Sequence, residues 1–203
     1  MVSRRDREKE FKKQLIAEAA YQLFSSSSFE TVTVEDIARM AEFGKGTLYL
    51  YFENKEDILV YIFCHGVEKL YNDIEEQCAQ EPDVIKALNL YMNLQYAFYQ
   101  KYHSMVLSLL RKKLKGTLNP DYFSDTMRRQ DIITDLVSRI LERGTQEGIF
   151  APVDSHKMAR IMKNILKGFS LEALELKNID AQKDLELIKK VLFNGILFER
   201  RDQ

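Results

Sequence analysis

Apolar side chains recur every three to four residues along most of this chain, which is the spacing of one face of an α-helix. The first such stretch covers residues from about 7 to 25 and ends at a run of serines, whose hydroxyls compete for backbone hydrogen bonds. No alternation typical of a strand extends beyond four residues. The pattern therefore predicts an all-α protein of about nine helices. The buried stripe of the first helix should contain Phe11, Leu15, Ile16, Ala19, Ala20, Leu23 and Phe24.

Polar residues that cap helices mark the next boundaries. Thr33 and Asp36 have the spacing of a capping box, so a short helix should begin directly after Thr33. A third short helix follows almost at once. Asn54 and Asp57 mark a second capped start, which opens a long helix that ends near Ala79.

The rest of the chain predicts longer and more apolar helices. Residues 83 to 102 are apolar nearly all the way round, which indicates a helix that is buried on most sides. A shorter helix over residues 104 to 114 follows, and then a long one that Gly148 should cap. The last two helices should cover about 154 to 175 and 181 to 200.

Composition agrees with a globular, helix-rich protein. The 203 residues are 45% hydrophobic and 30% charged, with only 8 Gly and 3 Pro, which excludes a disordered or collagen-like chain. The formal net charge is −1, so any attraction to nucleic acid must come from a local basic patch.

The sequence indicates a cytoplasmic protein without a membrane segment. Cys64 and Cys78 show no paired spacing and fit reduced thiols. The N-terminus runs directly into charged residues, and no apolar stretch approaches the roughly 18 residues of a membrane span. No residue pattern requires a cofactor or a metal ion.

Residues 31 to 57 predict a helix-turn-helix, in which the second helix is short enough to enter a DNA major groove about 12 Å wide. The lysine of this helix would reach phosphate or guanine, and the glycine would let the backbone approach the DNA. The threonine would contact a thymine methyl group or a phosphate, and the tyrosine hydroxyls would contact phosphates. The side chains left to face outward are those of Lys45, Gly46, Thr47, Tyr49 and Tyr51. Two more residues, Thr33 and Lys55, lie in the first turns of their helices, where the helix dipole favours a phosphate.

The order and spacing of these residues resemble the N-terminal domain of the TetR family of repressors. The resemblance covers about Ile16 to Leu59 and rests on the strings IAEAAYQLF, TVTVEDIARMA and GKGTLYLYFENKEDIL. It implies a regulator that binds a double-stranded DNA operator. The positions whose counterparts commonly contact DNA in that family are Thr33, Lys45, Thr47, Tyr49, Tyr51 and Lys55.

Three positions depart from the family pattern. Glu42 stands where a glycine usually occupies the turn, which implies a turn that tolerates another residue. Gly44 replaces a frequent serine or threonine and removes a hydroxyl that would contact phosphate. Leu50 replaces a frequent aromatic or polar residue, so it either reads a thymine methyl or packs inside the protein.

The resemblance also implies two domains: residues 1–53 would bind DNA, and residues 54–203 would dimerise and bind an effector. The last two helices would pair with their copies in a four-helix bundle of a homodimer, and Gly168 and Gly195 would permit close helix approach. The residues expected at this interface are Met162, Ile165, Phe169, Leu192, Phe193 and Ile196.

A small, largely apolar effector would fit the middle helices, whose tyrosine, phenylalanine and methionine side chains give adaptable apolar surfaces. For each single residue, plain core packing is favoured over contact with a ligand. The candidate ligand contacts are Tyr91, Met92, Tyr96, Tyr99 and Met127.

Two other classes of function compete with the regulator. An enzyme of the di-iron bundle type needs Glu-x-x-His, and none of His65, His103 and His156 has an acid three residues earlier. A helical adaptor that uses the first domain for protein contacts would show no salt-dependent DNA affinity. The sequence therefore favours a ligand-responsive repressor, which is not an enzyme.

Overall fold

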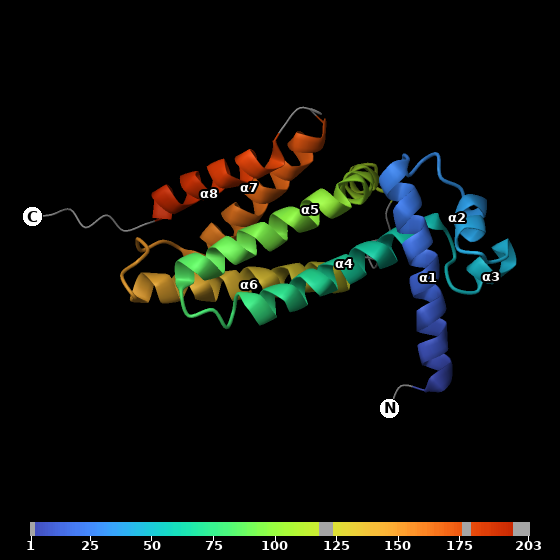
Figure 1. The fold of residues 1–203 in the computed structure, drawn as a ribbon, viewed down its shortest axis with the longest axis horizontal. Helices are drawn as coiled ribbons and strands as arrows, with labels where there is room; N and C mark the ends of the chain where they lie inside the picture. The colour runs from blue at the N-terminus through green and yellow to red at the C-terminus, as the bar shows by residue number, and fades with distance from the viewer. Residues whose placement is uncertain (1–2, 118–123, 176–179, 197–203) are drawn as a thin grey trace, which may run out of the picture. The chain divides into compact units, whose positions relative to one another are not determined.

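The structure, a computed structural model, describes residues 3–117, 124–175 and 180–196. Within these ranges it forms eight helices, so the predicted all-α class is confirmed (Figure 1). This agrees with the prediction of about nine helices, with the two helices expected at 83–102 and 104–114 joined into one continuous helix. The helices are α1 Arg4–Ser26, α2 Val34–Met40, α3 Lys45–Tyr49, α4 Lys55–Gln77, α5 Val84–Leu114, α6 Ser124–Gln146, α7 Ser155–Glu175 and α8 Ala181–Ile196.

The chain divides into two compact units. The first contains residues 1–66 and 104–125, and the second contains residues 67–103 and 126–203. Both α4 and α5 continue from one unit into the other along the chain. The division inside α5 falls between His103 and Ser104, which is where the sequence predicted one helix to end and the next to begin.

Helix α1 begins three residues earlier than predicted. The Ser3 hydroxyl accepts a hydrogen bond from the Asp6 N–H at 3.1 Å, and the Asp6 carboxylate accepts one from the Ser3 N–H at 3.2 Å, which is a complete capping box. The buried stripe is shorter than predicted, because Phe11 is 59% exposed and Leu15 is 42% exposed. Only the second half of α1 therefore contributes to the core of the first unit.

Helix α2 packs against both α1 and α3 in the first unit (Figure 1). The predicted capping box of α2 is confirmed, with Thr33 and Asp36 exchanging side-chain and backbone hydrogen bonds. At the other end of α2 the N–H of Phe43 donates to the Ala38 carbonyl at 2.9 Å, and the N–H of Glu42 donates to Arg39. This pattern is a Schellman motif, which requires a left-handed residue.

The left-handed residue of this turn is Glu42, with a φ of 58°. It is the only non-glycine residue with positive φ among those that the structure describes. The side chain is exposed, so nothing around it selects a glutamate there. The departure from the family pattern therefore leaves the turn intact and places a backbone strain in it.

In the second unit, α6 ends as predicted at Gly148, which has a φ of 70°. The N–H of Ile149 donates to the Gly144 carbonyl at 2.9 Å and closes a second Schellman motif. A Cβ atom on Gly144 would lie 2.2 Å from the ring of the buried Phe150. Gly144 is therefore required by close packing.

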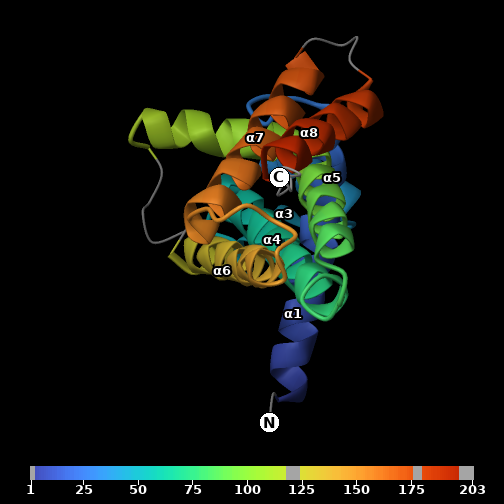
Figure 2. The ribbon, with the colours of Figure 1, turned by 90° about the vertical axis from the view of Figure 1, so that its left-hand side faces the viewer.

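Helices α7 and α8 lie side by side in the second unit (Figures 1 and 2). Their inward faces carry buried residues such as Met162 and Leu166 on α7 and Ile188 on α8. The N–H of Ala151 donates to the carbonyl of Ile196 at 2.7 Å, which ties the end of α8 to the segment before α7.

None of the helices in the described parts of the chain is both long and apolar enough to cross a lipid bilayer. In the same parts, neither cysteine takes part in a disulfide. Burial raises the pKa of Cys78 to about 11, so its thiol is protonated at neutral pH.

Candidate nucleic-acid interface

The centre of the predicted DNA-binding surface is α3, a helix of five residues. Its single buried side chain is that of Leu48, which is fully enclosed and attaches the helix to the core of the first unit. On the outward side, Lys45 and Gly46 are exposed, Tyr49 is 47% exposed, and Leu50 directly after the helix is 73% exposed. The helix is thus braced from one side and open on the other, as a recognition helix must be.

The Lys45 ammonium forms an ion pair with the carboxylate of Glu35, a residue of α2 that the sequence did not indicate. Both side chains are about half exposed. Glu35 raises the pKa of Lys45, chiefly through their hydrogen bond, and Lys45 lowers the pKa of Glu35 in the same way. Both groups are therefore charged at neutral pH, and a DNA phosphate would compete with Glu35 for the lysine.

Gly46 and Thr47 lie on the accessible side of α3. A Cβ atom built on Gly46 would have no described atom within 4 Å, so the backbone there is open to a close approach. The Thr47 side chain is half-buried, and the backbone N–H of Thr47 donates to the Gly44 carbonyl in the first turn. Gly44 caps α3 without a side-chain hydrogen bond, as its lack of a hydroxyl requires.

Leu50 does not pack inside the described part of this chain. Of the two roles that the sequence left open for it, only the outward one agrees with its exposure. A leucine on this surface offers an apolar contact to a thymine methyl group, which hydrogen-bonding residues on α3 do not supply.

The hydroxyl of Thr33 is already engaged at the start of α2. It donates to the Asp36 carboxylate at 2.6 Å and accepts from the Asp36 N–H at 3.1 Å. These hydrogen bonds with Thr33 lower the pKa of Asp36. Thr33 is exposed, so a phosphate can approach it, but its first role is to cap the helix that braces α3.

Lys55 points into the protein, where its ammonium donates to the carbonyls of Phe29 at 2.6 Å and Val32 at 2.7 Å. It also lies 4.3 Å from the centre of the Phe29 ring. Burial lowers the pKa of Lys55. This lysine fixes the loop before α2, and a phosphate contact would require it to leave these carbonyls.

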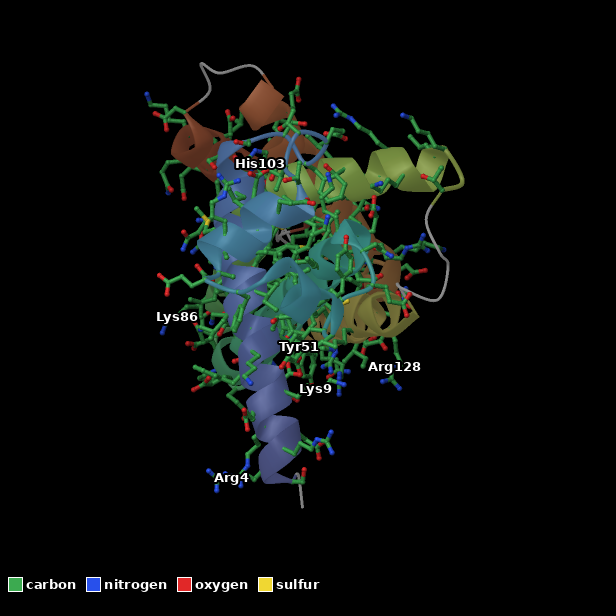
Figure 3. All side chains as sticks on the ribbon, turned by 90° about the vertical axis from the view of Figure 1, so that its right-hand side faces the viewer. Arg4, Lys9, Tyr51, Lys86, His103 and Arg128 are labelled. Carbon is green, nitrogen blue, oxygen red and sulfur yellow. The ribbon has the colours of Figure 1, made fainter. Side chains whose placement is uncertain are left out.

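The half-buried Tyr51 and basic residues at the start of α1 adjoin the predicted DNA-binding surface in the sequence-based prediction. The Lys12 ammonium donates a hydrogen bond to the Glu8 carboxylate at 3.0 Å, which raises the pKa of Lys12. Arg4 lies at the free end of α1, where its side chain is exposed (Figure 3).

Four of the five predicted ligand contacts are buried on the part of α5 that belongs to the second unit. They are Tyr91, Met92, Tyr96 and Tyr99. Burial raises the pKa of Tyr91 and of Tyr99. The side chain of Met127, the fifth, lies outside the part of the chain that the structure describes.

The predicted dimer contacts separate into two groups. Met162, Leu192 and Ile196 are buried in the core of their own chain. Phe169 is 42% exposed, and Ile165 and Phe193 are half-buried. The sequence missed other apolar residues that are exposed on the same two helices, which are Ile161, Leu187 and Val191.

The capped helix, the tight turn and the braced, outward-facing α3 define a DNA-binding protein of the helix-turn-helix class. The family model for bacterial regulatory proteins of the tetR family matches residues 16–62. This range contains the second half of α1, all of α2 and α3, and the turn between them. Residues 16–62 therefore form a DNA-binding domain of the TetR family, and relatives that match further along the chain are named helix-turn-helix-type transcriptional regulators.

The chain is 29% identical over 154 residues to the helix-turn-helix-type transcriptional regulator YhgD of Bacillus subtilis, an alignment that covers 74% of this chain and 78% of YhgD. A regulator from Saccharomonospora viridis, solved in complex with choline, has the same fold with a TM-score of 0.80 at 18% identity, covering 92% of this chain and 98% of its own. The fatty acid degradation regulator FadR of Bacillus halodurans gives a TM-score of 0.70 at 22% identity, covering 95% and 97%. Because the family consists of regulators, the enzyme alternative is excluded.

Proposed function

We propose that this chain is a repressor that binds a pseudo-palindromic operator as a homodimer and leaves it when a small, largely apolar effector binds. Residues 1–53 supply the surface that contacts DNA, and residues 54–203 supply the dimer interface and the effector site. The observation that carries the proposal is the open side of α3, where Lys45, Gly46, Tyr49 and Leu50 are exposed around a single buried anchor.

In the proposed complex, Lys45 exchanges its Glu35 partner for a phosphate or a guanine, and Gly46 lets the backbone approach the groove. Thr47, Tyr49 and Tyr51 donate hydroxyls to phosphates on either side. Thr33 contacts phosphate while it caps α2, and Lys55 acts mainly by fixing the loop before that helix.

The dimer interface is proposed on the exposed side of α7 and α8. Ile161, Ile165 and Phe169 are spaced four residues apart on α7, and Leu187 and Val191 are spaced four apart on α8. Each helix thus carries an apolar stripe that its own chain leaves partly exposed, as pairing with a second copy requires. Beside these stripes, Gly168 and Gly195 have no described atom within 4 Å of an added Cβ.

An effector with a large apolar part suits the buried tyrosine and methionine side chains of α5. Helices α4 and α5 both run from the second unit into the first, so each can carry a change at the effector site towards α3.

DNA binding is tested by selecting sites from a random duplex pool and measuring affinity by fluorescence anisotropy. Lys45→Ala and Tyr49→Ala should each weaken binding about tenfold, because each removes a contact to the duplex. Glu35→Gln should strengthen it, because it releases Lys45 and removes a negative charge. Helicity and sedimentation should not change.

Two results of this experiment would contradict the proposed function. Unchanged affinity in both alanine variants would show that α3 does not face the duplex. Affinity that does not fall with rising salt would favour the adaptor function, since contacts to phosphate release counterions.

A further inference from the structure

Gln95 lies at the centre of the buried face of α5 and is 0% exposed. Residues three and four positions away on a helix adjoin a side chain, and for Gln95 these are Tyr91, Met92, Phe98 and Tyr99, all of them buried. A carboxamide thus stands among apolar and aromatic groups in the second unit.

Neither the nitrogen nor the oxygen of the Gln95 carboxamide has a hydrogen-bond partner in the part of the chain that the structure describes. Buried polar groups are almost always paired, because an unpaired group loses its hydrogen bonds to water without replacement. Two other buried polar residues of the unit, Thr134 and Ser138, obey this rule. The Thr134 hydroxyl donates to the Gln130 carbonyl at 2.9 Å, and the Ser138 hydroxyl donates to Glu142.

A primary carboxamide presents a donor and an acceptor side by side. A ligand group that satisfies both at once must offer the complementary acceptor and donor on neighbouring atoms, as an amide, a lactam or an undissociated acid does. Simple esters and ethers offer acceptors alone and leave the Gln95 N–H groups paired but the oxygen unpaired. The side chain therefore discriminates between classes of polar head group.

Charge on the ligand is disfavoured at this position. The buried polar residues of the second unit that the structure describes are Gln95, Thr134, Ser138, Ser155 and Ser170, all of them uncharged. Lys163 is half-buried there, and its ammonium donates to the Thr134 hydroxyl at 3.1 Å. A carboxylate beside Gln95 would lose its hydration, and none of the fully buried polar residues described in this unit carries a compensating positive charge.

We infer that Gln95 is a ligand-binding residue, and that the effector carries a neutral group with adjacent hydrogen-bond donor and acceptor, such as a carboxamide, on an otherwise apolar body. This inference rests on the proposed effector function and specifies the polar part of a molecule that the sequence indicated only as apolar. Ser170 on α7, also 0% exposed with an unpaired hydroxyl in the described structure, is a second polar group of the same unit that a ligand could satisfy.

The test uses the full chain and three probes with the same alkyl part: decanamide, N,N-dimethyldecanamide and decanoate. The dimethyl compound keeps the acceptor of decanamide and lacks its donors. Binding is measured by isothermal titration calorimetry and by the rise in Tm. Decanamide should bind about tenfold more tightly than either other probe, as expected for one additional buried pairing.

Gln95→Met keeps the length of the side chain and removes its polar atoms. It should weaken decanamide about tenfold and leave the dimethyl compound within a factor of about two. It should also raise the Tm of the ligand-free protein, because the unpaired carboxamide is gone. Asn93→Met, at an exposed position of the same helix, is the matched control and should change neither quantity.

Each alternative outcome overturns a distinct claim. Probes that bind equally to the wild type and to Gln95→Met would refute the role of Gln95 and leave an apolar effector in place. A failure of all three probes to bind the wild type would refute the inference together with the apolar effector. A marked fall in the Tm of ligand-free Gln95→Met would show that Gln95 is paired within the protein, which also refutes it.

Discussion

At the residue scale, Glu42 shows how a turn keeps its geometry after losing the residue type that suits it. The Schellman hydrogen bonds of α2 force a φ of 58°, which a side chain with a Cβ adopts only with strain. The sequence showed that glutamate replaces the usual glycine in this turn. It could not show whether the backbone keeps its positive φ or the turn takes another conformation. The structure shows that the backbone is unchanged.

Glu42→Gly should therefore stabilise the first unit by about 1 kcal/mol, because glycine adopts positive φ without steric cost. Chemical denaturation followed by circular dichroism measures the change. Glu42→Ala is the control, since it removes the carboxylate and keeps the Cβ. A gain in the alanine variant equal to that in the glycine variant would attribute the effect to charge.

Lys55 and Lys45 differ in their roles. Lys55 stabilises the protein through hydrogen bonds to the loop before α2, whereas Lys45 faces outward. Lys55→Met should lower the free energy of unfolding by on the order of 1 kcal/mol, because two short hydrogen bonds to carbonyls are lost. Lys45→Met, the matched substitution on the exposed side of α3, should leave stability nearly unchanged. Equal stability of the two variants in a thermal denaturation experiment would contradict the role assigned to Lys55.

The sequence predicted which side chains of α3 are exposed, but it did not predict the partners of the lysines around that helix. Lys45, Gly46 and Tyr49 face outward as helical spacing required. The inward direction of Lys55 depends on the loop carbonyls of Phe29 and Val32, more than twenty residues away, and no local pattern contains that information.

At the scale of elements, local signals located most helix ends correctly. The capping box at Thr33 and the left-handed Gly148 both lie where the sequence placed them. The prediction of two helices at 83–102 and 104–114 was wrong. The apolar pattern changes near residue 103, where the compact units also divide, but the helical backbone of α5 continues. A change of buried face can occur within one helix, and periodicity alone does not distinguish it from a break.

The end of α6 offers a test of packing. Gly144→Ala should destabilise the second unit by about 1–3 kcal/mol, because the new methyl group would overlap the Phe150 ring and outweigh the better helix propensity of alanine. Gly46→Ala has no described atom within 4 Å of its new methyl group and should cause no such loss. Denaturant unfolding that shows the same stability for both variants would refute the close contact.

At the scale of the whole molecule, the exposed apolar stripes of α7 and α8 require an explanation that one chain does not provide. Residues such as Phe169 and Val191 remain partly accessible although buried neighbours lie on the same helices. The sequence showed that these helices are rich in apolar residues, but it could not assign each residue to the chain's own core or to a partner. That assignment depends on how the helices rotate when they pack.

Val191→Glu should convert the proposed dimer into monomers, because it would place a charge in the middle of an apolar interface. Sedimentation velocity at micromolar concentration measures the change in mass. Gln182→Glu adds the same charge in the first turn of α8, where a negative charge suits the helix dipole, and should leave the mass unaltered. A Val191→Glu protein that still sediments as a dimer would refute this interface.

The single buried anchor of α3 has a consequence for how such a regulator changes its target. Leu48 alone attaches the helix to the core, so the outward positions can be replaced with little effect on folding. New combinations of residues at these positions are open to selection or to engineering, as long as the leucine and the capped helix behind it persist. A regulator built this way acquires a new operator through its surface while its scaffold stays the same.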